Sequence, residues 1–433
     1  MNDIWNHEYE TMNRDELRGL QFKRLQMSLR WAYDNVPFHR ERWQALKLKP
    51  ADIHSLEDLN KVPLSAKSDF KKAYPYGLFA LPLEKVLRIH VSSGTTSSPT
   101  VLGYSRGDLN TWSELCARVA VAGGAHAQDV AQITFGYGLL TGGFGMQAGL
   151  ERIGATVIPA STGNTHRQLH IMRDFKTTVL LGTPTYALHL ADKAPELGYD
   201  FEELELRVGL FGSEPWTNQT REQIEERLGI SAADIYGVSE VVGPGISYEC
   251  WNKDGLHINE DHFLVEVVDP QTGESVPEGK EGELVFTSLT KEALPVVRYR
   301  TGDLASVSYR PCICGRVFAR HSKVYSRTDD MLIIRGVNVY PGQIEAVLAE
   351  MEGAEPHYQI LVNRRGALDE LEVQIEAEAP FFRDAVKELM GFQEQVEERL
   401  RQELGVRPRV RLVEPRTIPR REDDASPVVD NRP

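Results

Sequence analysis

The first thirty-five residues carry apolar side chains at a helical repeat. The apolar positions are Leu17, Leu20, Leu25, Leu29 and Tyr33. Asn35-Val36-Pro37 then interrupts the pattern, because proline lacks the N–H that a continuing helix needs. We predict an N-terminal helix that ends at this tripeptide.

From about residue 86 to residue 236, short apolar runs alternate with helical stretches. The runs cover 86–91, 131–138, 155–160, 178–184, 207–212 and 233–237, and the helical stretches include 108–122, 165–175, 185–196 and 217–228. This alternation predicts a doubly wound, mostly parallel sheet of the α/β class. Glycines at strand ends, at Gly136, Gly182, Gly212 and Gly237, indicate crevices where such sheets bind ligands.

Beyond residue 240 the pattern changes to strands and turns. Residues 263–289 predict two strands joined by a long Pro/Gly-rich connection, and 331–339 begin a strand-and-turn unit. Residues 341–351 and 383–404 are helical in pattern, with strands near 371–377 and 409–414. We therefore expect a β-rich end to the large domain and a small α+β domain after it.

Composition narrows the class of protein. The 433 residues are 41% hydrophobic and 26% charged, which is ordinary globular usage and excludes a disordered or collagen-like chain. No apolar run approaches the roughly 18 residues that span a bilayer, and the first residues do not resemble a signal peptide. Four cysteines are too few for a disulfide scaffold, so we expect a cytoplasmic protein.

The charge balance bears on partners. With 49 Lys+Arg against 63 Asp+Glu, the net charge is −14, which argues against broad nucleic-acid binding. A local nest of backbone N–H groups still binds small anions at any net charge. We expect small-molecule partners, no nucleic acid and no membrane, and the oligomeric state stays open, with a homodimer among the alternatives.

A Ser/Thr-rich segment follows the first apolar run. It contains Ser92, Ser93, Gly94, Thr95 and Thr96, whose hydroxyls and backbone N–H groups can wrap a polyphosphate. The spacing of a Walker loop is missing. Taken alone, the segment is equally a Ser/Thr-rich turn.

Four further motifs follow in order: GSEPW (212–216), DIYGVSE (234–240), YRTGD (299–303) and SRTDDMLIIRGVNVYP (326–341). The ordered set resembles the adenylate-forming superfamily of acyl-CoA synthetases, peptide-synthetase adenylation domains and luciferases. FGYGLLTGGFG, LFGSEPWTN, TSLTKEALPVVRYRTGDL and DDMLIIRGVNVYPGQIE are similar to phenylacetate–CoA ligases and related aryl-CoA ligases. WNHEYETMNRDEL and the terminal VVDNRP also match, so the resemblance covers essentially the whole chain.

The resemblance implies a two-step ligase. An aromatic carboxylate and ATP give an acyl-adenylate and pyrophosphate, and the CoA thiol then displaces AMP. ATP, Mg²⁺ and CoA are the implied cofactors. It also implies a large domain, 1–328, and a small mobile domain, 329–433, with a hinge at Asp329.

Each motif then supplies residues to the nucleotide by resemblance. Ser93 to Thr96 hold phosphates, Tyr236 stacks on adenine, Glu240 binds Mg²⁺, and Asp303 accepts from the ribose with Arg327 beside it. The implied ATP/AMP set is Ser92, Ser93, Gly94, Thr95, Thr96, Gly212, Ser213, Glu214, Pro215, Asp234, Tyr236, Gly237, Ser239, Asp303 and Arg327. Outside their motifs, Glu240 and Asp303 would read as surface carboxylates.

The acyl and CoA sites are implied in the same way. We expect the acyl pocket against a strand carrying 135–143, lined by Phe135, Tyr137, Gly138 and Leu140, where members of the family carry Phe at the last position. Candidate walls are Phe211, Trp216 and Pro244, although aromatics are more often core residues. Arg335, Gly336 and Val337 line the implied CoA tunnel; the residues alone show only a glycine turn.

Two positions depart from the family pattern. Ser97-Ser98 replaces Gly-Lys in the phosphate loop, and Asp424 stands where the adenylation lysine belongs. That lysine stabilises charge developing in the transition state, so an anion there costs on the order of 10²–10³ in rate. Arg420 and Arg421 are close enough in sequence to substitute in part, with Arg420 the candidate catalytic cation.

The departure at Asp424 keeps two alternatives open. The chain is an adenylation-impaired relative that binds nucleotide or uses a preformed adenylate. Otherwise, it activates an acid but delivers it to an amine, an oxyacid or a carrier-protein thiol.

Cysteines give a separate signal. Cys250, His257, Cys312 and Cys314 supply three thiolates and an imidazole, a set suited to tetrahedral, structural Zn²⁺. Unrelated cytosolic thiols are the alternative. Cys116 is left over as a core residue of a helix.

Overall fold

The computed structural model describes residues 4–92, 100–328, 332–334, 337–351, 354–365, 368–377, 386–419 and 427–431. The candidate residues outside these ranges are Ser93, Gly94, Thr95, Thr96, Asp329, Arg335, Gly336, Arg420 and Asp424. For Ser92 and Val337 only the backbone is described. The chain forms two units, the first of Met1–Ser213, Gln223–Thr301 and Ala305–Lys323, the second of Glu214–Glu222, Gly302–Leu304 and Val324–Pro433.

The first unit begins with three helices, α1 (His7–Glu10), α2 (Arg14–Asn35) and α3 (Pro37–Ala45). The predicted helix is confirmed, and it ends at Asn35. Pro37 then opens α3 at a position where its missing N–H costs no hydrogen bond. Leu25 and Leu29 of α2 pack with Trp43 of α3 and with Leu264, so the helices cover the β-rich part of this unit.

The strand predicted at 86–91 lies outside the large sheet. It is β1 (Arg88–Ser92), and it pairs antiparallel with β2 (Thr100–Tyr104) in a two-stranded sheet. Only seven residues separate the two strands, whereas a parallel crossover needs a dozen or more. The prediction that this run belongs to the doubly wound sheet was therefore wrong.

The large sheet has nine strands in the order β13-β14-β9-β8-β7-β6-β5-β3-β4. Its parallel half consists of β3 (Val130–Ile133), β4 (Thr156–Ile158), β5 (Val179–Gly182), β6 (Val208–Gly212) and β7 (Ser231–Val238). Its antiparallel half adds β8 (Gly243–Glu249), β9 (Leu256–Ile258), β13 (Val307–Ser308) and β14 (Arg320–His321). The predicted parallel order is confirmed for the first half.

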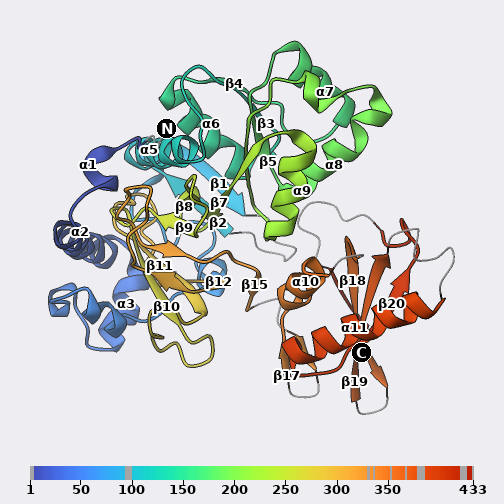
Figure 1. Ribbon diagram of the computed structural model, residues 1–433. Helices are drawn as coiled ribbons and strands as arrows, with labels where there is room; N and C mark the ends of the chain where they lie inside the picture. Colours follow the sequence, from blue (N-terminus) through green and yellow to red (C-terminus); the bar gives the residue numbers. More distant parts are fainter. Residues whose placement is uncertain are drawn as a thin grey trace. The chain divides into compact units, whose positions relative to one another are not determined.

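Helices accompany the parallel strands (Figure 1). They are α5 (Arg106–Ala122), α6 (Gly142–Ile153), α7 (Thr165–Asp174), α8 (Pro184–Lys193) and α9 (Asn218–Leu228). Ser105 and Asp108 cap α5 reciprocally, and Thr183 caps α8. The expectation of a strand through 135–143 was wrong: β3 ends at Ile133, and α6 begins at Gly142. Glycines at four of the twelve α6 positions obscure its apolar repeat.

The predicted two strands in 263–289 are confirmed as the antiparallel pair β10 (Phe263–Val268) and β11 (Gly282–Ser288). Strand β12 (Tyr299–Ala305) follows, and its residues Gly302–Leu304 belong to the second unit. Short elements complete the first unit. These are α4 (Lys67–Lys72) and the single-turn helices η1 (Pro50–Asp52), η2 (Glu57–Lys61), η3 (Leu83–Lys85), η4 (Pro195–Leu197) and η5 (Phe201–Glu203).

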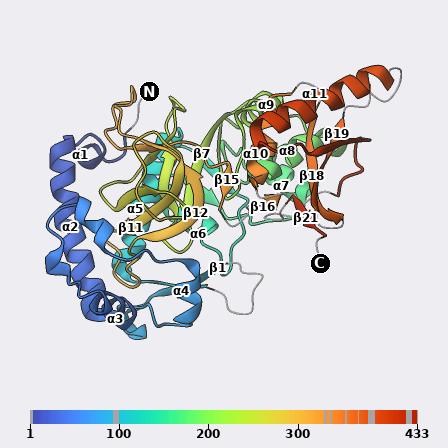
Figure 2. The same cartoon turned by 90° about the horizontal axis from the view of Figure 1, so that it is seen from below.

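The second unit has its own sheet and core. Its elements are β15 (Ser326–Arg327), β16 (Leu332–Ile334), β17 (Val337–Val339), α10 (Pro341–Ala349), β18 (Ala354–Arg365), β19 (Leu368–Ala377), α11 (Val386–Leu404), β20 (Arg409–Val413) and β21 (Val428–Asp430). The sheet order is β20-β19-β18-β21, and α10 and α11 pack on it (Figure 2). Ile344, Ile360, Val373 and Leu400 are core residues of this unit. Strand β18 was not predicted.

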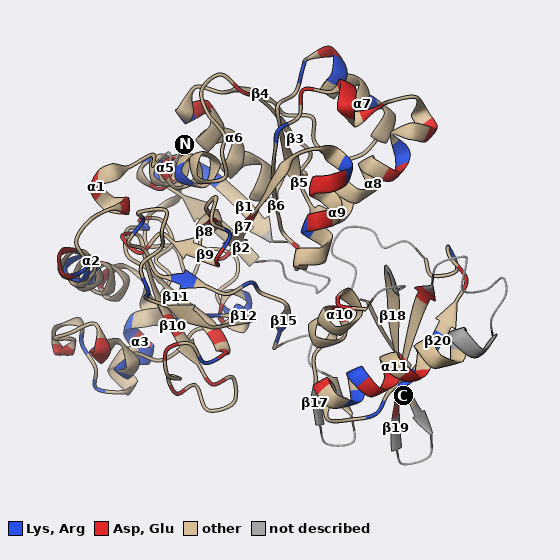
Figure 3. Cartoon of the chain, in the orientation of Figure 1, with Lys and Arg blue, Asp and Glu red and all other residues tan. Residues whose placement is uncertain are grey.

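Charged residues of both signs are interspersed along the helices, as on α7, α8, α9 and α11 (Figure 3). Among the described residues, no helix is long and apolar enough to cross a membrane.

Candidate functional site

The carboxyl ends of β6 and β7 bring two motifs together. Phe211 and Gly212 of β6 face Asp234 and Ile235 of β7 in register. A Cβ at Gly212 would lie 2.1 Å from the Ile235 carbonyl oxygen, so only glycine permits this approach. Ser213 follows with a positive φ of 71° and is exposed. The motifs GSEPW and DIYGVSE therefore meet at one strand edge, which sequence order alone does not require.

Tyr236 is half-buried at this edge and has an aromatic wall behind it. The His321 ring lies edge-on 5.0 Å from the Tyr236 ring centroid, and Phe286 lies 6.3 Å away. His321 also hydrogen-bonds to the Ser247 hydroxyl at 2.6 Å, and burial lowers its pKa to about 4, so the imidazole is neutral. The sequence offered no partner for His321, because β14 joins the large sheet through a pairing with β9, which is distant in sequence.

Asp234 lies two positions before Tyr236 and has polar contacts separate from the aromatic neighbours of Tyr236. Its carboxylate pairs with Lys323 at 3.3 Å, and both side chains are largely buried. Its backbone N–H donates to Glu249 at 2.8 Å. Lys323 was not among the predicted residues, since it lies outside every motif.

Glu240 follows β7 in a turn and is 5% exposed. Its Oε1 has no hydrogen-bond partner among the described residues, and it forms an ion pair with Lys67, whose Nζ lies 3.8 Å away. A buried carboxylate without a donor loses solvation and gains little in return. Such an oxygen suits a hard cation such as Mg²⁺, so the side chain fits the metal that the resemblance implies.

A buried lysine lies beneath this turn. Lys291 Nζ donates to the Val241 carbonyl at 2.7 Å and lies 5.0 Å from the centre of the Tyr104 ring. Burial lowers the pKa of Lys291 to about 8, while the charges of Asp108 and Glu240 raise it. Sequence reasoning missed Lys291, although the motif TSLTKEALPVVRYRTGDL contains it. The only signal was a lysine within an otherwise apolar stretch.

The second unit contributes a charged pair of its own. Asp303 of β12 and Arg327 of β15 face each other in register and form an ion pair, with Asp303 4% exposed. The Thr328 N–H donates to the Gly302 carbonyl at 2.6 Å and closes the strand pair. The two residues that the resemblance placed side by side are thus adjacent.

Glu214, Pro215 and Trp216 also belong to the second unit. Pro215 is exposed, whereas Trp216 is 3% exposed and lies under the Arg221 guanidinium, 5.1 Å from the ring centre. The surroundings of Trp216 are those of a packed core residue.

The candidate acyl residues of the first unit lie in the loop after β3 and on strands β6 and β8. Phe135 is buried, Leu140 is 43% exposed, and Gly138 has a φ of +88°. The Tyr137 ring lies edge-on to Phe144 at 5.0 Å, and its hydroxyl has no partner among the described residues. Burial raises the pKa of Tyr137 to about 12.

The two wall candidates of the first unit differ in environment. Phe211 is fully buried, with its ring over Gly209. The Pro244 carbonyl accepts from the Trp112 indole at 2.7 Å and from the Cys116 thiol at 3.4 Å. Ser239 lies nearby, with its hydroxyl 3.1 Å from the Thr141 hydroxyl. Gly237 lies within β7 at a bulge, where a Cβ would meet the Gly243 carbonyl at 2.1 Å.

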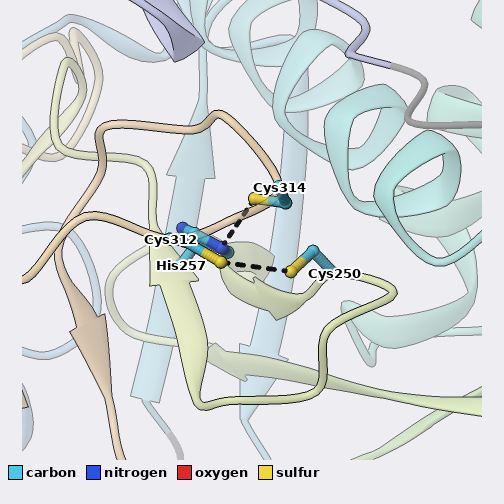
Figure 4. A group of neighbouring side chains, drawn as sticks. All are labelled: Cys250, His257, Cys312 and Cys314. Atoms are coloured by element: carbon cyan, nitrogen blue, oxygen red, sulfur yellow. Dashed lines mark hydrogen bonds between the residues drawn. The ribbon is translucent and has the colours of Figure 1, made fainter.

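Cys250, His257, Cys312 and Cys314 converge on one point (Figure 4). All four are buried, and their ligand atoms lie within 4.8 Å of one another. The Cys250 and Cys312 sulfurs are 3.8 Å apart, and Cys314 Sγ lies 3.4 Å from His257 Nε2. In a tetrahedral zinc site, two sulfurs about 2.3 Å from the ion lie about 3.8 Å apart, and a sulfur and a nitrogen about 3.5 Å.

The surroundings of this Cys/His cluster also suit a metal. His257 Nδ1 lies 3.3 Å from the Phe318 carbonyl, which directs Nε2 toward the cysteines. The Asn252 amide donates to Cys312, and a hydrogen bond from Cys250 lowers the pKa of Cys314. A thiolate is the form that binds metal. The four residues therefore fit a closed zinc site, whereas Cys116 is buried alone on α5.

Comparison with known proteins identifies relatives of the whole chain. The family model of AMP-binding enzyme matches residues 41–290, and that of the AMP-binding enzyme C-terminal domain matches residues 336–432. The phenylacetate-coenzyme A ligase of Thermus thermophilus is 45% identical over 432 residues, covering 97% of each chain. That of Pseudomonas putida is 46% identical, covering 98% of this chain and 96% of the relative.

A solved structure shares the fold. The 2-hydroxyisobutyryl-CoA ligase in complex with 2-HIB-AMP superimposes with a TM-score of 0.91 and 29% identity. The match covers 99% of this chain and 92% of that chain.

Proposed function

Because the chain belongs to the AMP-binding enzymes and, within them, to the phenylacetate–CoA ligases, we propose that it converts an aromatic carboxylic acid to its CoA thioester with ATP. The acid first attacks the α-phosphorus of ATP, forming an acyl-adenylate and releasing pyrophosphate. The thiol of CoA then attacks the acyl carbon, and AMP leaves. The observation that carries the proposal is the 45% identity over 97% of both chains with a phenylacetate-coenzyme A ligase.

The site residues have roles in this proposal that the geometry supports. Tyr236 offers a partly exposed ring for adenine, and Asp303 offers a carboxylate for the ribose hydroxyls. Glu240 is the residue to hold Mg²⁺, which when bound screens the phosphate charges. Phe135, Tyr137 and Leu140 supply an apolar surface suited to an aromatic ring.

One residue favours a second candidate. Asp424 puts an anion where the family pattern has a lysine, so an adenylation-impaired protein that binds nucleotide or a preformed adenylate is the alternative. Transfer of the acyl group to an amine, oxyacid or carrier-protein thiol is the remaining variant of the first candidate.

The deciding experiment mixes the protein with Mg·ATP and a panel of phenylacetates and benzoates. We expect pyrophosphate release that depends on the acid, and an aryl-CoA product by mass once CoA is added. Release without an aryl-CoA product would indicate another acceptor. No release with any acid, together with aryl-CoA formation from synthetic aryl-adenylate, would favour the adenylation-impaired alternative.

We also propose that the Cys/His cluster binds one structural Zn²⁺ per chain. The Cys250–Cys312 sulfur distance of 3.8 Å and the Cys314 sulfur to His257 Nε2 distance of 3.4 Å support a tetrahedral site with no position left open for catalysis. We also propose a reducing compartment such as the cytoplasm, since all four cysteines are described and none forms a disulfide.

A further inference from the structure

Lys291 is a buried cation that none of the proposed steps uses. Its side chain is 8% exposed, and the ion pairs found among the described residues do not include it. Its ammonium instead meets backbone carbonyls, Val241 at 2.7 Å and Glu240 at 3.5 Å, and the face of Tyr104. Burying an ammonium without a carboxylate partner is costly, so a lysine kept there needs an explanation.

The segment that carries Lys291 is fixed on its far side. The Asp108 carboxylate accepts from the N–H groups of Glu292 at 2.7 Å and of Ala293 at 2.9 Å, the two residues that follow the lysine. Asp108 is itself held at the start of α5 by its capping exchange with Ser105. Hydrogen bonds to Asp108 at the start of α5 therefore fix the backbone of the segment that positions the Lys291 ammonium.

The contacts of Lys291 are made with the turn that carries Glu240. This turn is closed by N–H groups of Val241 and Val242 that donate to the Val238 carbonyl at 3.0 and 3.1 Å. Two carbonyls of the turn accept hydrogen bonds from side chains. The Val241 carbonyl accepts from Lys291 Nζ, and the Val242 carbonyl accepts from the Tyr104 hydroxyl at 3.0 Å. Several backbone groups of the turn are thus hydrogen-bonded, while Glu240 Oε1 has no hydrogen-bond donor among the described residues.

We propose that Lys291 is a positioning residue for adenylate formation: it holds the Val238–Val242 turn so that the Glu240 carboxylate is presented to the metal–nucleotide. The inference rests on the proposed role of Glu240. It assigns Lys291 no contact with substrate, because its ammonium contacts two backbone carbonyls and the Tyr104 ring. Removal of a group that orients a metal ligand typically lowers metal affinity or activity by roughly 10–100-fold.

The experiment compares Lys291→Met with the wild type in each half-reaction. Pyrophosphate release reports adenylate formation, and aryl-CoA formation from synthetic phenylacetyl-adenylate and CoA reports the second step. The second step involves no polyphosphate and so needs no bound metal. We expect kcat/KM for Mg·ATP to fall roughly 10–100-fold, with the second step nearly unchanged, which also shows that the variant is folded.

A binding measurement removes the dependence on turnover. Water proton relaxation with Mn²⁺·ATP as the probe gives the affinity of wild type and variant for the metal–nucleotide, and we expect about a tenfold loss or more in Lys291→Met. The matched control is Lys61→Met, which replaces an exposed lysine paired with Asp58 and should change neither readout.

Three outcomes would overturn the inference. Equal losses in both half-reactions would indicate general destabilisation, and unchanged Mn²⁺·ATP affinity would show that the turn does not depend on the lysine. A loss as large in Lys67→Met, whose Nζ is 3.8 Å from the Glu240 carboxylate and whose side chain is 47% exposed, would assign the effect to nearby charge. Failure of the proposed function is separate, since it would leave the wild type itself without pyrophosphate release or aryl-CoA.

Discussion

Two residues of opposite charge, Glu240 and Lys291, are buried next to each other without forming an ion pair. Glu240 lies in the Val238–Val242 turn, and Lys291 donates to a backbone carbonyl of the same turn. Direct pairing would satisfy the carboxylate and leave it nothing to offer a metal. With the lysine on the carbonyls, Glu240 Oε1 has no hydrogen-bond donor among the described residues and only the ion pair with Lys67 at 3.8 Å, which is destabilising for the fold. In our proposal this oxygen is available to a metal.

Asp424 carries the sharpest prediction at the scale of a residue. Asp424→Lys restores a cation where adenylation develops negative charge, so we expect the rate of pyrophosphate release to rise on the order of 10²–10³. The measurement is acid-dependent pyrophosphate release under saturating Mg·ATP.

Asp423→Lys is the matched control, since it makes the same charge change one position away. Equal gains from both variants would reduce the effect to net charge. No gain from Asp424→Lys would mean that another cation already stabilises the charge that develops during adenylation, with Arg420 as the candidate.

The motifs in the sequence pointed to individual candidate residues, whose roles in binding stay predictions. Tyr236, Asp303 and Arg327 were found through motifs, and the last two are in contact. His321, Lys323 and Lys291 were missed because each acts through a partner far away in sequence. Such pairings depend on strand order, which a local pattern does not encode.

Among the elements, regular strands and helices followed the predicted pattern, and the exceptions have local causes. Strand β1 has the composition of a parallel strand, but its connection to β2 is too short for a crossover. Helix α6 was missed because its glycines obscure the repeat, and these glycines let α5 approach closely: a Cβ at Gly149 would lie 2.4 Å from the Cys116 backbone.

The elements that meet at the Cys/His cluster lead to a prediction about metal. Purified protein should contain about one zinc per chain, and Cys312→Ser should lose it, because the set has no spare thiolate. Metal analysis by mass spectrometry after exhaustive dialysis measures both.

Cys116→Ser is the control for that experiment. Its thiol is buried on α5 and contacts the Pro244 carbonyl, so zinc content should be unchanged. Wild-type protein free of zinc after growth in zinc-replete medium would refute the proposal.

At the scale of the molecule, the two units have separate cores, which predicts separate responses to core mutation. Leu29→Ala and Leu400→Ala each remove a fully buried side chain, one in each unit. Each should lower the free energy of unfolding of its own unit by about 2–5 kcal/mol. Scanning calorimetry should show two transitions, each lowered by only one of the variants. A single transition lowered by both would contradict this.

The Cys/His cluster has a consequence for the unfolded chain. Cys250 and Cys312 are 62 positions apart, so an ion held by both closes a long loop of polypeptide. A covalent crosslink over such a loop removes conformational entropy worth roughly 4 kcal/mol from the unfolded ensemble. Coordination achieves the same restriction without an oxidant and can be undone by a chelator. A bound ion would thus act as a reversible crosslink between the segments that carry Cys250 and Cys312.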